Sequence, residues 1–119
     1  MVIQLELPYP PSVNHYWGQH GKFKYLGKKG KIFRQEVMEK VAEAGLKALE
    51  GNLAMHVALY PPDRRKRDVD NVLKPLLDAC EHAGCYLNDA QISELHILRR
   101  DVIKGGACHI VILTLDSPL

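Results

Sequence analysis

The chain has 119 residues, of which 46% are hydrophobic and 25% are charged, and its formal net charge is +2. This length suits one domain that buries about two-thirds of its unfolded surface, so we predict a single domain over residues 1–119. No apolar run approaches the ~20 residues of a membrane-spanning helix, which argues against an integral membrane protein and predicts no membrane partner.

The first residues show the alternation of a half-buried β-strand. Apolar side chains occupy every second position from Ile3 to Leu7, with polar side chains between them. Prolines at positions 8, 10 and 11 end this strand, and four glycines interrupt the segment that follows. We therefore expect residues 8–31 to form a long loop, and a loop of this length in a small domain is usually functional or mobile.

Two segments show the spacing of amphipathic helices. Apolar residues recur every three or four positions from 31 to 49, and again from about Val69 to Ala83. Pro75 fits the second helix only if that helix begins near Asp70, because a missing N–H costs little only close to the first turn.

Three more strands complete the pattern. Residues 53–60 alternate and end at two prolines, and residues 92–102 and 108–115 are strand-like segments joined by Lys104-Gly105-Gly106, which predicts a hairpin. The order β-α-β-α-β-β predicts an α+β fold of two layers, with the helices packed on one face of a mixed four-stranded sheet.

The most informative segment directly follows the strand at 53–60. It reads Asp63-Arg64-Arg65-Lys66-Arg67-Asp68-Val69-Asp70-Asn71. Four adjacent cations repel one another unless a polyanion is near, and two carboxylates two positions apart repel one another unless a cation lies between them. A nucleic-acid backbone and a divalent metal would satisfy both demands. We therefore predict a metal-dependent enzyme that acts on phosphodiesters.

The distribution of charge along the chain favours the same partner. Residues 20–67 hold twelve Lys or Arg against five Asp or Glu, whereas residues 68–119 hold four against eight. Binding to a phosphate backbone is driven by counterion release, so the basic segments are candidates for phosphate contact. Solvated helix faces are often equally rich in lysine, and charge alone leaves nucleic-acid binding open.

The two carboxylates after the basic run suit a hard cation. In an extended chain, the Cα atoms of Asp68 and Asp70 would lie roughly 6 to 7 Å apart on one side. Mg²⁺ binds one or two carboxylates together with waters and substrate phosphate. An EF-hand is excluded, because Val72 and Leu73 stand where its loop needs an oxygen ligand and a glycine. The alternative is that Asp70 or Asn71 only caps the second helix.

Two further charged residues follow this pair. Lys74 lies one turn after Asp70, so its ammonium could neutralise a reacting phosphate or simply pair with Asp70 and Asp78. Asp89 falls in a loop before the next strand, where it either serves a turn or returns to Asp68 as a third carboxylate.

The cysteines indicate the compartment rather than the chemistry. Cys80, Cys85 and Cys108 are an odd number and lack the paired spacing of a zinc site. No charged and then apolar leader with a small-residue cleavage site opens the sequence. We therefore expect a protein of the reducing cytoplasm, with all three thiols in the core or without a chemical role.

Three motifs occur in order over nearly the whole chain: Leu7-Pro8-x-Pro10-Pro11-Ser12-x-Asn14, Asp63-Arg64-Arg65-Lys66-Arg67-Asp68-Val69-Asp70-Asn71-Val72-x-Lys74 and Leu87-Asn88-Asp89-Ala90-Gln91-Ile92. Together they resemble the RusA family of Holliday junction resolvases, and the central motif is the specific one. The resemblance implies a RusA-like fold and a homodimeric, Mg²⁺-dependent endonuclease, with Mn²⁺ as an alternative ion. Such an enzyme binds four-way DNA junctions in recombination and repair and makes paired symmetric nicks. Its relatives are bacterial and often prophage-borne.

The resemblance also assigns roles to single residues. It places the acidic metal ligands at Asp68, Asp70 and Asp89 and the catalytic lysine at Lys74, and it gives Arg67 a phosphate contact. With the basic run and the lysine-rich loop, the expected DNA-binding residues are Arg64, Arg65, Lys66, Arg67, Asn14, Lys22, Lys24, Lys28 and Lys29.

Two departures and two alternatives accompany this interpretation. Many members of the family have a second acid where this chain has Asn88, and Pro75 bears on where the second helix begins. Neither removes a matched catalytic position. The first alternative is a junction or duplex DNA-binding protein that does not cleave, in which Asp70 only caps a helix. The second, a phosphohydrolase of nucleotides, is less favoured because a small substrate gives no reason for so many separated cations.

Overall fold

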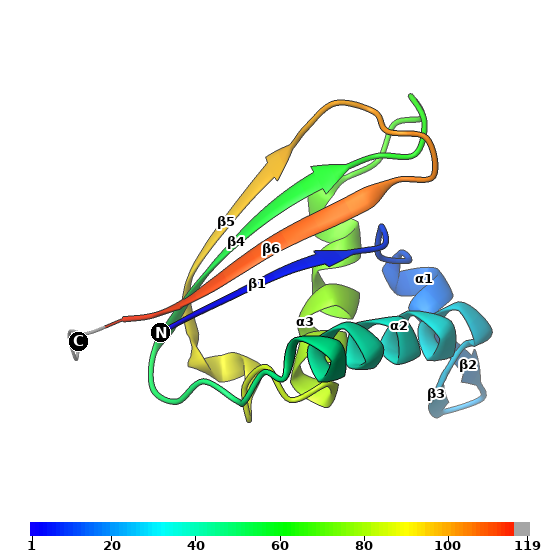
Figure 1. Ribbon diagram of the computed structural model, residues 1–119. Coiled ribbons are helices and arrows are strands. Elements are labelled where there is room, and N and C mark those ends of the chain that lie inside the picture. Colours follow the sequence, from blue (N-terminus) through cyan, green and yellow to red (C-terminus); the bar gives the residue numbers. More distant parts are fainter. Residues whose placement is uncertain (116–119) are drawn as a thin grey trace.

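The computed structural model describes residues 1–115, which form a mixed four-stranded sheet with helices on one face (Figure 1). Its strands are β1 (Val2–Leu7), β4 (Leu53–Tyr60), β5 (Ile92–Arg99) and β6 (Ala107–Thr114), in the spatial order β1-β6-β4-β5. β6 is antiparallel to both β1 and β4, whereas β4 and β5 are parallel. The predicted two-layer α+β architecture is confirmed.

The last two strands do not form the predicted hairpin. Within residues 1–115, β6 lies between β1 and β4, and β5 pairs only with the other side of β4. The turn at Lys104-Gly105-Gly106 belongs to a connection that crosses the end of β4, where the N–H of Ile103 donates to the carbonyl of Pro61 at 2.9 Å. A parallel pair such as β4 and β5 needs a crossover, which α3 (Leu73–His82) provides. Local turn chemistry carries no information about this pairing.

The first long helix, α2 (Lys28–Ala44), begins three residues before the predicted start and ends five residues before the predicted end. Gly45 ends it in the left-handed region, with φ of 64°, and its N–H and that of Leu46 satisfy carbonyls of the last turn. The apolar spacing continues past the end of the helix because Leu49 is also buried. Leu49 does not belong to a helical turn; its backbone forms an isolated β-bridge with Tyr86.

The segment predicted as a loop is largely regular, so that prediction is wrong for its central part. It forms a one-turn helix, α1 (Val13–Tyr16), and a two-stranded hairpin of β2 (Trp17–His20) and β3 (Phe23–Leu26). Each strand has only four residues, and most of their side chains are exposed. The alternation that marks a half-buried strand is therefore absent from the sequence.

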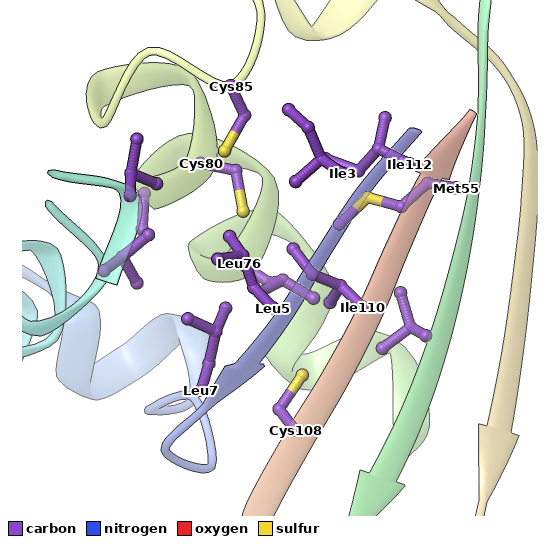
Figure 2. Packing of buried hydrophobic residues seen from close by; sticks show 14 of the residues in the cluster. Ile3, Leu5, Leu7, Met55, Leu76, Cys80, Cys85, Cys108, Ile110 and Ile112 are labelled. Atoms are coloured by element: carbon purple, nitrogen blue, oxygen red, sulfur yellow. The ribbon is translucent and has the colours of Figure 1, made fainter. Parts of the chain in front are cut away.

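The apolar core lies between the sheet and the helices α2 and α3 (Figure 2). The three cysteines are buried and free, as expected for core residues, and burial raises the pKa of the Cys108 thiol to about 12. The core residues labelled in Figure 2 are Ile3, Leu5, Leu7, Met55, Leu76, Cys80, Cys85, Cys108, Ile110 and Ile112.

Within residues 1–115, no helix combines the length and the apolar character needed to cross a bilayer.

Truncation of one core side chain tests this packing. Leu76 is fully buried in α3, so Leu76→Ala should lower the free energy of unfolding by about 2–5 kcal/mol through lost contacts and a residual cavity. Leu87→Ala is the matched control, because Leu87 is 81% exposed and its loss should cost less than about 0.5 kcal/mol. Urea denaturation measures both values, and equal losses for the two variants would contradict the placement of Leu76.

Candidate active site

The candidate site begins where the chain leaves the sheet at the carboxyl end of β4. Pro61 and Pro62 cannot continue a strand ladder, and residues 63–68 run outside the sheet with most of their cations exposed. A 3₁₀ turn, η1 (Val69–Val72), then leads into α3. The basic run and the acidic pair are thus presented on a short exposed segment between a buried strand and a buried helix.

The side chain of Asp63 organises the basic run. Its two carboxylate oxygens accept hydrogen bonds from the guanidinium of Arg67 at 2.7 and 3.0 Å, and one of them also accepts the N–H of Arg65 at 2.9 Å. The Arg67 side chain is half-buried, whereas those of Arg64 and Lys66 are exposed. The Arg67 hydrogen bonds, together with the Arg65 N–H, lower the pKa of Asp63 to about 2. Asp63 therefore neutralises Arg67 and also lies near the Arg65 guanidinium, whereas Arg64 and Lys66 form no ion pair within residues 1–115.

Arg67 also joins segments that are distant in the sequence. Its guanidinium carbon lies 5.9 Å from the centre of the Tyr9 ring, a cation–π contact with the segment after β1. Its carbonyl oxygen accepts a hydrogen bond from the guanidinium of Arg99 at the end of β5. The residue expected to contact phosphate thus also fixes the basic segment to the sheet.

Two open pockets flank the basic segment. The first, of about 490 Å³, is lined by residues 63–68 together with Arg99 and Arg100. The second, of about 400 Å³, brings part of the same segment together with His15 and Lys29. Asp68 lines both pockets, so this carboxylate stands between two basic hollows.

The two neighbouring carboxylates lie at the start of η1. Asp68 is extended, with φ −79° and ψ 134°, but Asp70 is already inside the 3₁₀ turn, so the pair does not continue an extended strand. Neither η1 nor α3 has a side-chain capping hydrogen bond, and Val72 is the N-cap of α3. The alternative that Asp70 or Asn71 caps the second helix is therefore wrong. Within the described residues no ion pair engages either carboxylate.

Lys74 and Asp89 meet although fifteen positions separate them. The ammonium of Lys74 lies 3.3 Å from a carboxylate oxygen of Asp89. The alternative pairing of Lys74 with Asp70 and Asp78 is wrong, because Asp78 pairs with an arginine of α2. Pro75 is the third residue of α3, close to the first turn as expected.

The loop that carries Asp89 is held by its own hydrogen bonds. The Asn88 side chain accepts the N–H of Ala90 at 2.8 Å, and the Gln91 side chain accepts the N–H of Asn88 at 3.1 Å, which forms a capping box around a short 3₁₀ turn. The N–H of Asp89 donates to Glu81 of α3 at 2.7 Å. Asn88, which departs from the common motif, therefore has a structural role in placing Asp89.

A second network holds α3 against the other helices. The guanidinium of Arg34, in α2, donates to a carboxylate oxygen of Asp78 at 2.8 Å and to the hydroxyl of Tyr16 at 2.9 Å. The Tyr16 hydroxyl in turn donates to Asp78. Burial raises the pKa of Tyr16, so this hydroxyl stays protonated. The network lies one turn beyond Lys74 and fixes the direction of the helix that carries it.

The carboxylates match a hard cation in chemistry, but three of them do not meet at one point. Within residues 1–115, no three Asp, Glu, His or Cys side chains are close enough together to hold a metal ion. Asp68 and Asp70 are neighbours in chain position, whereas Asp89 is held by Lys74. Unpaired carboxylate oxygens are the ligands that Mg²⁺ and Mn²⁺ prefer.

The structure separates the expected DNA-binding residues into two groups. Lys29 lines the second pocket beside the basic run, whereas Lys22 and Lys24 lie on the β2–β3 hairpin and Asn14 is exposed on α1. Lys28, at the first position of α2, is exposed between them. Sequence reasoning missed four residues around the pockets, and only their contacts in space reveal them: Tyr9, His15, Arg99 and Arg100.

Comparison with known proteins decides the family. The model of the family described as Endodeoxyribonuclease RusA matches residues 8–112. The chain belongs to the RusA family. A protein of Enterobacteria phage HK97 named crossover junction endodeoxyribonuclease RusA is 37% identical over 115 residues, which are 96% of both chains. Proteins of the same name from Escherichia coli K12 and Enterobacteria phage 82 are 34% and 33% identical over 117 residues, 95% of both chains.

Membership in the RusA family confirms the resemblance and the expected class of enzyme, an endodeoxyribonuclease. The central RusA motif, residues 63–74, lies within the matched range and forms the segment between the two pockets. The part of this RusA chain with the most specific sequence is thus also the part where its cations and free carboxylates gather.

The pairing of Asp63 with Arg67 predicts a measurable titration. Arg67→Gln should raise the pKa of Asp63 from about 2 toward its ordinary value of 3.8. Because the folded-state pKa is depressed, the pair contributes stability above the ordinary value and loses it as the pH falls through about 2. An NMR titration of the Asp63 carboxyl carbon measures the change. Arg64→Gln is the control and should leave the pKa low; the same low value in the Arg67 variant would contradict the assignment.

Proposed function

We propose that this RusA-family chain resolves Holliday junctions by paired symmetric nicks, in a reaction that depends on Mg²⁺. The relatives that bear the crossover junction name match nearly the whole chain, which supports the substrate class. The observation that carries the proposal is the position of two carboxylates, Asp68 and Asp70, which form no ion pair within residues 1–115 and lie directly beside the exposed cations of the basic run. Such a site offers cations that bind the phosphate and carboxylates that can hold a metal ion, and hydrolysis of a phosphodiester uses both.

Each residue would have a distinct task in cleavage. Asp68 and Asp70 would hold Mg²⁺, with Mn²⁺ as an alternative, and the bound ion would supply an activated water and a polarised phosphate oxygen. Asp89 would become the third ligand only by turning from Lys74 toward this pair, because the three carboxylates do not meet in the structure. The Lys74 ammonium, oriented by Asp89, would offset the negative charge that develops on the phosphate. Both carboxylates of the acidic pair are exposed and free of ion pairs within the described residues, so neither must break a contact to act as a ligand.

The cations would guide the DNA to these groups. Arg64, Arg65 and Lys66 extend from the segment that lines both pockets, and Arg99 and Arg100 close the first pocket from the other side. Contacts of this kind bind the backbone without regard to sequence and weaken as salt rises. They would position the scissile phosphate at the acidic pair.

We infer that the active form is a homodimer, because a four-way junction offers two equivalent scissile strands and a two-fold dimer offers two equivalent sites. The sheet face opposite the helices is uncovered in Figure 1 and bears the stacked rings of His56 and His96 beside Leu98 and Val111. Three strands of eight residues and one of six span about 480 Å² of flat sheet. A stable interface buries ~800 Å² per partner, so residues at the rim of this face would have to contribute as well.

The alternative is a protein that binds junction or duplex DNA without cutting it. Its main structural argument, that Asp70 only caps a helix, is removed by the missing cap hydrogen bond. Incubation of the purified protein with a labelled four-way junction or a linear duplex, with Mg²⁺ or EDTA, separates the two functions. Symmetric nicks in the junction that require Mg²⁺ support the resolvase, whereas binding without a cut supports the alternative.

The acidic pair gives the sharpest variant. Asp70→Asn keeps the shape of the side chain but removes its charge, so cleavage in Mg²⁺ should fall by roughly 10²-fold or more while junction binding persists. Glu43→Gln, on the exposed face of α2, is the matched control and should cut at the wild-type rate. A full cleavage rate in Asp70→Asn would contradict the assignment of Asp70 as a metal ligand.

The proposed dimer is tested by mass in solution. Size-exclusion chromatography with light scattering should give twice the 13.4 kDa of one chain. Val111→Glu places a charge at the centre of the uncovered face and should yield a monomer, whereas Met38→Glu, on an exposed position of α2, should remain a dimer. A monomeric wild type contradicts the dimer, and a dimeric Val111 variant places the interface elsewhere.

A further inference from the structure

The β2–β3 hairpin exposes aromatic side chains on one of its faces. In its register His20 is opposite Phe23 and Gly18 is opposite Tyr25, so His20, Phe23 and Tyr25 share one side of the two strands. Phe23 is 76% exposed and Tyr25 is 54% exposed. Packing does not account for these two rings, because neither Phe23 nor Tyr25 belongs to the apolar core.

The other face fixes the hairpin to the body of the protein. Trp17 packs edge-on against the buried Tyr16, with 4.5 Å between ring centres, and Leu26 packs against the apolar core. The N–H of Gly27 donates to the Tyr16 carbonyl at 2.8 Å and closes the base of the hairpin. The exposed rings are therefore carried on an anchored element.

The exposed rings are also arranged locally. The Tyr25 ring covers Gly18, and a β-carbon at position 18 would collide with it. Glycine at position 18 thus allows the Tyr25 ring to lie against the backbone of β2. The aromatic face has a defined shape and is more than a single exposed side chain.

The charge around this face selects an anionic partner. Residues 7–35 contain six Lys or Arg and no Asp or Glu. Lys22 precedes Phe23 in the turn, Lys24 lies on the opposite face of β3, and Lys29, just beyond the hairpin, lines the pocket that contains Asp68. In Figure 1 the hairpin, α1 and the segment after β4 follow one side of the molecule. Positive charge thus extends from the candidate active site to the aromatic rings.

We propose that Phe23, supported by Tyr25, stacks on an unstacked base at the branch point of the junction. This inference rests on the proposed function. Exposed aromatic rings on a basic element are the combination that binds nucleic acid whose bases are accessible, since the cations bind the phosphates and the rings stack on the base faces. A linear duplex hides its base faces within the stack, whereas a distorted branch point exposes them. The hairpin therefore favours branched over linear DNA.

The test is a double-mutant cycle between the protein and the DNA, measured as binding affinity without added divalent metal. One junction is intact, and a second has abasic residues at the branch point. Phe23→Leu, which keeps an apolar side chain but removes the ring, should weaken binding to the intact junction about tenfold. It should leave binding to the abasic junction and to a linear duplex nearly unchanged. Phe23→Tyr, which keeps an aromatic ring, should retain the wild-type preference for the intact junction.

Two controls keep the outcomes distinct. The sole tryptophan, Trp17, lies at the base of the hairpin, so unchanged emission in Phe23→Leu shows that the hairpin still packs on the body. An equal loss on intact and abasic junctions, or no loss on either, overturns base stacking. A wild type that neither binds nor cuts the junction overturns the proposed function itself, whereas normal cleavage with an insensitive Phe23 overturns only this inference.

Discussion

The buried side chain of Tyr16 is the point to which the helices and the hairpin are tied. Its hydroxyl joins Asp78 of α3 to Arg34 of α2, and its carbonyl oxygen accepts the N–H of Gly27 between the hairpin and α2. Removal of one member would leave a polar or charged group without its partner in a partly buried place, which costs more than the pair contributes. Because α3 carries Lys74 one turn before Asp78, this network positions the candidate chemistry as well as the fold.

The sequence predicted those parts of the fold whose signal is local and periodic. Strands β1 and β4 alternate because one of their faces is buried, and the helix before Gly84 shows a clear apolar stripe. The pairing of β6 with β1 depends on contacts between residues about a hundred positions apart, for which no local signal exists. The sequence does not predict the hairpin of residues 17–26, because its strands are short and exposed. It predicts too long a helix for α2, because apolar residues continue past Gly45.

The same distinction applies to the candidate site, where consecutive residues are predictable from the sequence and pairings between distant residues are not. Asp68, Asp70 and the basic run could be predicted, because they are consecutive and their mutual repulsion needs an explanation. The pairing of Lys74 with Asp89 and the pairing of Asp63 with Arg67 were not predicted, since any of several opposite charges was within reach. Arg99 and Arg100 were missed because they end a distant strand, and only the parallel alignment of β4 and β5 brings them to the pocket.

The position of β6 governs when the sheet can assemble. It is the last strand in chain order, yet it lies between β1 and β4 and is the only strand that pairs with β1 within the described residues. A growing chain therefore holds β1 without a neighbour until the last strand has left the ribosome. Loops that span almost the whole chain must then close, which makes folding slow and leaves an apolar strand edge open in the meantime. The nascent protein thus keeps an open apolar strand edge until β6 is made, even though most of its core residues are already present.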